Sequence, residues 1–246
     1  MTHTLAITGK SGSGKTTLVK AFANVIKNAF PNSSILLVDN DLTEQLASRL
    51  GLKIRSTIYG IRSGKHEYKT GIPEGMSKQE FIEWALEDII VNVDENVDII
   101  VSWLVASKDC RCPITNQMNE ALVKLIDRYD FVIFDCEFDL KYLNQLVDYP
   151  IDTTLIVTND DLESIHLASG IYEFSRKYAD NGQIGVVLNK ACKENLNKAL
   201  EQLTGDELEV LGIIDNFECN EKFEENIENS IKDFYVRLNL PQEGVM

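Results

Sequence analysis

Short, continuous runs of apolar residues alternate with helical patterns along the whole chain. The runs are rich in valine, isoleucine and leucine, a composition typical of central strands covered on both faces. They predict strands at 4–8, 34–39, 97–104, 131–135, 153–158, 184–189 and 208–214. Segments long enough for helices lie between most of them, at 15–29, 77–92, 114–128, 139–147, 160–179 and 193–204. This alternation predicts an α/β fold with right-handed crossovers and a mostly parallel sheet of seven or eight strands.

One stretch, 51–76, fits neither pattern. It holds five glycines and one proline among many charged residues, which predicts a long surface excursion. Residues 229–246 predict a packing helix followed by a tail. The sequence contains no proline- or serine-rich linker, internal repeat or low-complexity tract, so we expect a single domain over residues 1–246.

The charge balance narrows the range of partners. Lysine and arginine total 24, aspartate and glutamate total 39, and the net charge is −15. This balance disfavours a nucleic-acid partner and docking on an anionic membrane, and no apolar run approaches the ~20 residues that span a bilayer. The sequence shows no secretory signal, and its five cysteines are an odd number. We therefore expect a reducing, cytoplasmic location without a disulfide framework.

Residues 9–16 match G-x-x-x-x-G-K-[ST], the pattern of a phosphate-binding loop, and they lie between a predicted strand and a predicted helix. The glycines allow backbone N–H groups to point at phosphate oxygens, and the start of the helix favours an anion. We expect Lys15 to reach the β- and γ-phosphates of ATP, Thr16 to ligate Mg²⁺ and Thr17 to meet the α-phosphate. The expected nucleotide-binding residues are Gly9, Lys10, Ser11, Gly12, Ser13, Gly14, Lys15, Thr16 and Thr17, with Asn189 farther along the chain.

Carboxylates follow two of the other predicted strands. Asp39 and Asp41 come at the end of 34–39, and Asp135 ends 131–135. The carboxyl ends of parallel strands meet beside the phosphate loop, where Mg²⁺ and the attacking water must lie. We expect Asp135 to hold Mg²⁺ through water, although an aspartate at a strand end also caps loops.

Lys10, directly after Gly9, resembles the signature lysine of the deviant P-loop ATPases, which include the nitrogenase iron protein and the septum-positioning Min ATPases. The resemblance implies that ATP closes a homodimer in which Lys10 reaches the partner's nucleotide. It also implies that Asp41 orients the attacking water and that Asn189 reads adenine. The alternatives are a solvated lysine, a helix N-cap at Asp41 and a turn-forming asparagine. Ser11 replaces a glycine usual in the group, and 213–221 lacks its usual proline.

Cys110 and Cys112 form a C-x-C pair in the loop after 97–104. Two thiolates at this spacing can bind one soft metal ion, but they supply two of the four ligands that Zn²⁺ prefers. A two-fold dimer would supply the other two and create a Cys₄ site for Ni²⁺ or Zn²⁺. The alternative is a pair of free, partly buried thiols.

The combination of these motifs resembles the CooC-type accessory ATPases that mature nickel carbon monoxide dehydrogenase. The specific parts of the resemblance are the C-x-C loop and the stretch IPEGMSKQEFIEWALEDIIV at 72–91; it extends to YDFVIFDCEFDLKYL at 129–143 and VLNK at 187–190. It implies an ATP-hydrolysing metallochaperone whose client is carbon monoxide dehydrogenase or acetyl-CoA synthase. The glycine- and proline-rich character usual before the cysteines is missing from 102–109.

Three other classes of protein remain open at this stage. A partitioning or positioning ATPase of the ParA/MinD kind needs a membrane-binding tail or a basic DNA-binding face. An electron-transfer ATPase like the nitrogenase iron protein would bridge a cluster with widely spaced cysteines, such as Cys110 and Cys136. A small-molecule kinase needs an arginine-rich lid, and arginines are sparse and unclustered in this chain.

Overall fold

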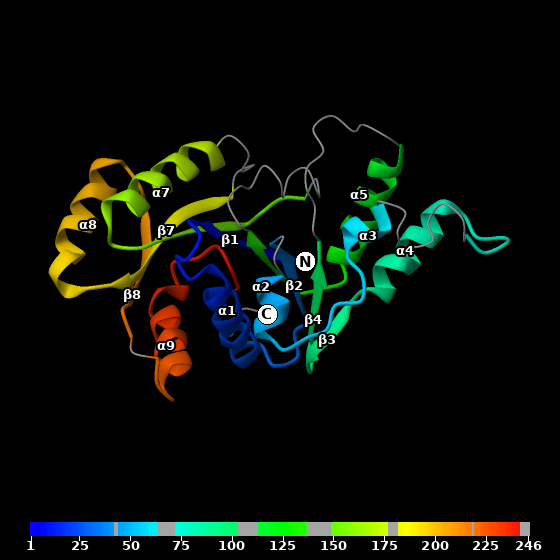
Figure 1. The fold of residues 1–246 in the computed structure, drawn as a ribbon, viewed down its shortest axis with the longest axis horizontal. Helices are drawn as coiled ribbons and strands as arrows, with labels where there is room; N and C mark the ends of the chain where they lie inside the picture. The colour runs from blue at the N-terminus through cyan, green and yellow to red at the C-terminus, as the bar shows by residue number, and fades with distance from the viewer. Residues whose placement is uncertain are drawn as a thin grey trace.

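The protein is described by a computed structural model that covers residues 1–41, 44–62, 72–102, 113–136, 149–176, 182–217 and 219–241. The described residues form three layers, with an eight-stranded sheet between two layers of helices (Figure 1). The strand order is β3-β4-β2-β5-β1-β6-β7-β8, and β3 alone among these strands is antiparallel to its neighbour. Within the same ranges, no helix combines the length and the apolar character needed to cross a membrane.

The strands are β1 (His3–Gly9), β2 (Ile35–Asn40), β3 (Val91–Asp94), β4 (Val97–Val101), β5 (Phe131–Cys136), β6 (Thr153–Thr158), β7 (Gln183–Ala191) and β8 (Val210–Asp215). β1 lies in the middle of the sheet, between β5 and β6. Every residue of β5 and β6 is buried, because helices cover both faces of the central strands.

The helices are α1 (Lys15–Ala29), α2 (Gln45–Arg49), α3 (Ile58–Arg62), α4 (Lys78–Asp88), α5 (Pro113–Ile126), α7 (Leu162–Ser175), α8 (Lys193–Gly205) and α9 (Phe223–Tyr235). Helices α1, α2 and α9 cover one face of the sheet (Figure 1). Helices α3, α4 and α5 cover one half of the other face, and α7 and α8 cover the other half. Alternate residues of each strand supply the two cores: Leu5 and Ile7 face α1, whereas Ala6 faces the opposite layer.

Each of the seven predicted strands corresponds to a strand of the structure, and β3 is an eighth that the pattern did not show. The predicted strand at 97–104 is β4, which ends at Val101, and residues 103 and 104 lie outside the described residues. The predicted helix at 77–92 is too long, because α4 ends at Asp88 and β3 begins three residues later. The β-branched valines of β3 pair with β4 across a tight turn in which Asn96 adopts φ 60°. The start of α4 is set by a reciprocal capping box between Ser77 and Glu80.

Two other predictions need correction. The C-terminal helix expected at 229–246 is α9, which starts earlier and buries Ile227, Ile231 and Phe234 against α1 and β8. The expected surface excursion at 51–76 is partly wrong, because α3 lies within it and buries Ile58 and Ile61 in the core beneath α4 and α5. The predicted helix at 139–147 and residues 63–71 lie outside the described residues.

The glycine at the end of β1 gives a stability prediction. Gly9 adopts φ 140°, and a Cβ placed there would lie 2.2 Å from the carbonyl oxygen of Val157 in β6. Gly9→Ala should therefore lower the free energy of unfolding of the nucleotide-free protein by about 1–3 kcal/mol or more, measured by urea denaturation. Gly205→Ala is the matched control, since a Cβ meets nothing within 4 Å there and should be neutral or slightly stabilising. Equal stabilities for the two variants would contradict the assigned constraint.

Candidate functional site

The loop between β1 and α1 has the geometry of a phosphate cradle. Gly9, Gly12 and Gly14 all have positive φ, and Gly14 is the N-cap of α1. Because Gly14 has no side chain, the first N–H groups of α1 are not capped by one and face the loop. The Lys15 ammonium folds back and donates to the carbonyl of Lys10 at 3.1 Å, so it lies across the mouth of the loop.

Two residues at the end of β7 hold this loop from outside. The Asn189 side-chain amide donates to the Ser13 carbonyl at 2.7 Å, and a Cβ on Gly14 would meet that amide at 2.4 Å. The Lys190 ammonium donates to the Gly12 carbonyl at 2.9 Å, from a residue with φ 56°. Asn189 therefore lies in β7 against the phosphate loop and not in a turn. Its predicted contact with adenine remains a prediction.

The expected carboxylates gather at the carboxyl end of the sheet. Strand register places Asp39 of β2 directly beside Asp135 of β5, and both are buried. The backbone N–H groups of Asp41 and Ala47 donate to the two oxygens of Asp39, at 3.1 and 3.0 Å. Asp39 thereby anchors the start of the chain after β2, and α2 begins at Gln45 with Glu44 as its N-cap, so Asp41 is not the N-cap of this helix.

Burial dominates the electrostatics of these groups. Burial raises the pKa of the Asp135 carboxyl to about 7, and the nearby charge of Asp39 adds to the rise. A hydrogen bond from Thr16 and the positive charge of Lys15 lower the pKa of Asp135 in part. Burial likewise raises the pKa of Asp39 to about 6, against the lowering effect of its backbone hydrogen bonds. The site thus holds more negative charge than Lys15 alone compensates.

The same residues fit Mg²⁺. Oδ2 of Asp135 is buried, and among the described residues it has no hydrogen-bond partner. Thr16 hydrogen-bonds Asp135, so its hydroxyl lies beside that carboxylate. Mg²⁺ usually binds proteins through one or two such oxygens, with waters and substrate phosphates completing an octahedron. Thr16 and Asp135 are therefore the residues that would hold Mg²⁺ here.

The phosphate cradle opens into a pocket with a volume of about 340 Å³. Lys15, Thr16, Thr17 and Asp41 line its phosphate end. The other end is lined by residues from the ends of β7 and β8, from the segment after β8 and from α9: Asn189, Lys190, Ile214, Asp215, Asn216, Phe217, Cys219, Phe223 and Ile227. The end that carries cations suits the phosphates of a nucleotide. The end that carries amides and aromatic rings suits the base.

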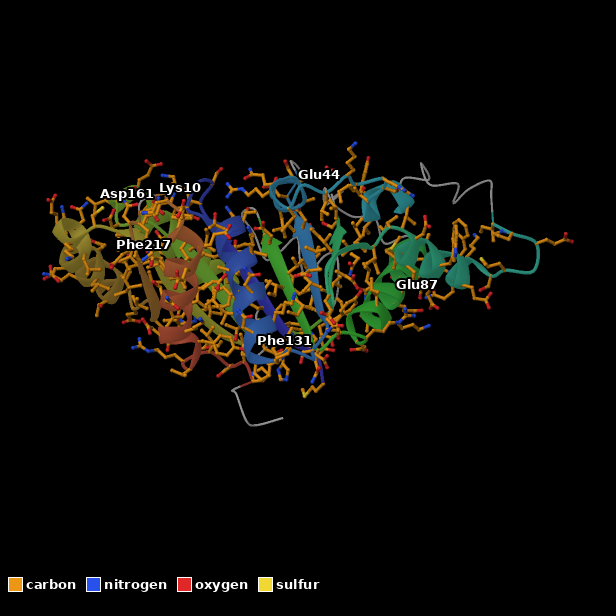
Figure 2. All side chains as sticks on the ribbon, turned by 90° about the horizontal axis from the view of Figure 1, so that it is seen from below. Lys10, Glu44, Glu87, Phe131, Asp161 and Phe217 are labelled. Carbon is orange, nitrogen blue, oxygen red and sulfur yellow. The ribbon has the colours of Figure 1, made fainter. Side chains whose placement is uncertain are left out.

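Lys10 lies in the phosphate loop directly before Ser11, which lines this pocket. Its ammonium is 3.1 Å from a carboxylate oxygen of Glu163 at the start of α7. Figure 2 shows Lys10 beside Asp161, the N-cap of α7, whose pKa is lowered mainly by a hydrogen bond from Ser164 and in smaller part by the charge of Lys10. The Glu163 side chain is 84% exposed and that of Lys10 is 30% exposed. Lys10 therefore makes an intrachain ion pair at the surface.

Sequence patterns missed part of the pocket. Gln45 and Arg49 of α2 line its phosphate end, and Asn216 and Phe217 line the other end. A rule that polar residues follow parallel strands would have found Asn216, which comes directly after β8. No spacing rule would have found Arg49, because α2 is too short to show a helical period.

The cysteines are divided among several places. Cys136 is buried at the end of β5, Cys192 is half-buried and Cys219 is exposed at the pocket rim. Cys110 and Cys112 lie outside the described residues, within which no group of three or more metal-binding side chains occurs.

The raised pKa of Asp135 predicts a pH-dependent effect on stability. Asp135 binds a proton more tightly in the folded than in the unfolded protein. The charged form of Asp135 therefore lowers the free energy of unfolding, fully above pH 7 and progressively less as the pH falls toward 4. Without Mg²⁺ and nucleotide, Asp135→Asn should be more stable than wild type at pH 8, by on the order of 1–4 kcal/mol. Thermal unfolding from pH 4 to 8 measures this, with exposed Asp233→Asn as control. A difference that does not change with pH would refute the assignment.

Comparison with known proteins agrees with this geometry. The family model AAA_31, described as an AAA domain, matches residues 2–188. An uncharacterized ATP-binding protein of Methanocaldococcus jannaschii is 28% identical over 198 residues, which is 77% of this chain and 75% of that protein.

Two solved structures have a similar fold. The MinC:MinD cell division complex of Aquifex aeolicus matches with a TM-score of 0.63 at 19% identity, over 93% of this chain and 86% of that one. A putative plasmid partition protein of Borrelia burgdorferi bound to AMPPNP matches with a TM-score of 0.64 at 19% identity, over 97% of this chain and 100% of that one. The family match, the phosphate loop and the sheet order together place this chain in the AAA_31 family of P-loop ATPases, with the MinD/ParA fold.

Proposed function

We propose that this chain is an ATP-hydrolysing switch that acts as a homodimer, in which Lys10 of each protomer binds the nucleotide of the other. The observation that carries the proposal is the position of Lys10 in the phosphate loop, directly before the pocket-lining Ser11, in a surface ion pair with Glu163. Ion pairs of this kind contribute about 0–1 kcal/mol, so exchanging Glu163 for a partner's phosphates costs little.

The surface around Lys10 supports a second copy as the partner. Leu162 and Leu167 of α7 are 54% and 38% exposed, and Leu162 is the immediate neighbour of Glu163. A dimer that brings Lys10 to another protomer's phosphates would cover this part of α7 and remove these apolar side chains from water.

The pocket residues have separate roles in hydrolysis. Lys15 and the loop N–H groups bind the β- and γ-phosphates. Thr16 and Asp135 would hold Mg²⁺, which would supply positive charge against the phosphates. Asp41, buried at the pocket wall, orients a water molecule. That water attacks the γ-phosphorus, the bond to the β–γ bridging oxygen breaks, and ADP and phosphate form. Because these charges are held in place before the reaction, they stabilise the transition state without reorganisation.

The cargo of the switch is a metal ion. Cys110 and Cys112 of both protomers bind Ni²⁺ or Zn²⁺ when ATP closes the dimer, and the client is carbon monoxide dehydrogenase or acetyl-CoA synthase. The support is the C-x-C pair together with the resemblance at 72–91. A contact in the structure adds to it: the Ser102 hydroxyl donates to the side-chain oxygen of Asn40, which lies between Asp39 and Asp41. Ser102 directly follows β4 and is the last described residue before the cysteine segment in the sequence.

Lys10→Ala tests the dimer. With Mg²⁺ and a non-hydrolysable ATP analogue, wild type should become dimeric in analytical ultracentrifugation, whereas Lys10→Ala should stay monomeric and still bind the analogue. Its ATP turnover should fall by about 10²-fold or more, since a transition-state charge contact is lost. Lys20→Ala is the matched control, because Lys20 also makes an intrachain ion pair, with Glu224 at 2.6 Å. A Lys10→Ala protein that dimerises and hydrolyses ATP like wild type would contradict the proposal.

Replacing Cys110 and Cys112 together by serine tests the cargo. Anaerobic wild type with Mg²⁺ and the ATP analogue should bind about one Ni²⁺ or Zn²⁺ per two chains, because four thiolates complete one site. The double variant should lose this ion and should fail to activate nickel-free carbon monoxide dehydrogenase. The control replaces Cys192, a half-buried cysteine outside the C-x-C pair and outside the pocket lining. Unchanged metal content in the double variant would show that these thiols are not the site.

A positioning ATPase is the second candidate, and the likeness of fold to MinD and a plasmid partition protein favours it. The net charge of −15 opposes binding to DNA or to anionic lipid. Pelleting with DNA or with anionic phospholipid vesicles in the presence of ATP separates the two candidates. An electron-transfer ATPase would instead yield brown, iron-containing protein.

A further inference from the structure

Arg49 lies at the phosphate end of the pocket, and neither the sequence motifs nor the proposed hydrolysis uses it. It is the last residue of α2, whose Leu46 and Ala47 are fully buried. The Ala47 N–H donates to Asp39 Oδ2 at 3.0 Å, which ties the helix to the end of β2. The backbone that carries Arg49 is therefore held against the core, although its side chain is exposed.

The guanidinium of Arg49 contacts the phosphate loop helix directly. Its Nη1 donates to the Thr17 hydroxyl at 2.9 Å, in the first turn of α1. None of the ion pairs recorded between residues that the structure describes includes Arg49. The Arg49 guanidinium thus lies beside the phosphate loop. Its hydrogen-bond partner there is a hydroxyl, and it makes no ion pair with a carboxylate among the described residues.

Position and chemistry together indicate which phosphate Arg49 meets. From the loop motif we expect Lys15 and Thr16 to meet the β- and γ-phosphates and Mg²⁺, and Thr17, the next residue, to meet the α-phosphate. A guanidinium has five donors in a planar fork that matches two phosphate oxygens at once, so it can keep or exchange the Thr17 contact when an anion arrives.

We propose that Arg49 is a nucleotide-binding residue that donates to the α-phosphate in its own protomer. The proposal rests on the proposed nucleotide-dependent function, but it does not depend on dimerisation, on hydrolysis or on the metal cargo. Both di- and triphosphates carry the α-phosphate, so Arg49 serves ATP and ADP alike.

Calorimetric titration with Mg-ADP and with a magnesium-bound non-hydrolysable ATP analogue tests the proposal. Arg49→Ala should weaken both nucleotides by a similar factor of about 10- to 100-fold, the range for one charged hydrogen-bonding contact. Arg49→Lys keeps the charge but loses the fork, so its affinities should be intermediate. The KM of Arg49→Ala for ATP should rise by a similar factor, because the contact is the same in ground and transition states.

Arg128→Ala is the matched control, since Arg128 is an exposed arginine paired with Glu87 at 2.6 Å between α5 and α4. Affinities of Arg49→Ala within about twofold of wild type for both nucleotides would overturn the proposal. Weakened binding of the triphosphate alone would also overturn it and assign the guanidinium to the γ-phosphate. Failure of the proposed function is recognised separately, because wild type would then bind neither nucleotide or would bind both without the Lys10-dependent dimer.

Discussion

The burial of two carboxylates side by side is the electrostatic constraint on which the site depends. Strand register places Asp39 against Asp135, and burial raises the pKa of both. Two such charges are stable together only near cations. Lys15 supplies one positive charge within the protein, and Mg²⁺ bound through Thr16 and Asp135 would supply more. Binding of magnesium and nucleotide would therefore offset the energetic cost of burying these two carboxylates.

Several distant segments hold the phosphate loop in the shape that this chemistry requires. β7 supports the loop through Asn189 and Lys190, and β6 packs so closely on Gly9 that no side chain fits there. Asp39 has two roles. It accepts hydrogen bonds from the backbone N–H groups of Asp41 and Ala47, and its charge raises the pKa of Asp135. The end of β2 is thus hydrogen-bonded to the residue after β4 and to α2. β4 precedes the cysteine segment in the sequence, and α2 carries Arg49.

The central strands and the phosphate loop were predictable because both are local patterns. A run of valine, isoleucine and leucine indicates a strand buried on both faces, and the glycines of the loop indicate residues with positive φ. The short elements were not predicted, because β3, α2 and α3 each contain four or five residues, which is too few to show a hydrophobic period. Their place is decided by packing, as in α3, where Ile58 and Ile61 bury beneath α4 and α5.

By itself, the sequence determined the α/β class, the phosphate loop and the three carboxylates at strand ends, since each depends on neighbouring residues and on where a strand stops. The tertiary structure alone decided which of these groups meet and what joins them. Asn189 and Ser13 are 176 positions apart, and Arg49 and Thr17 are 32 apart. Contacts of this kind follow from strand order and helix packing, which no local pattern encodes.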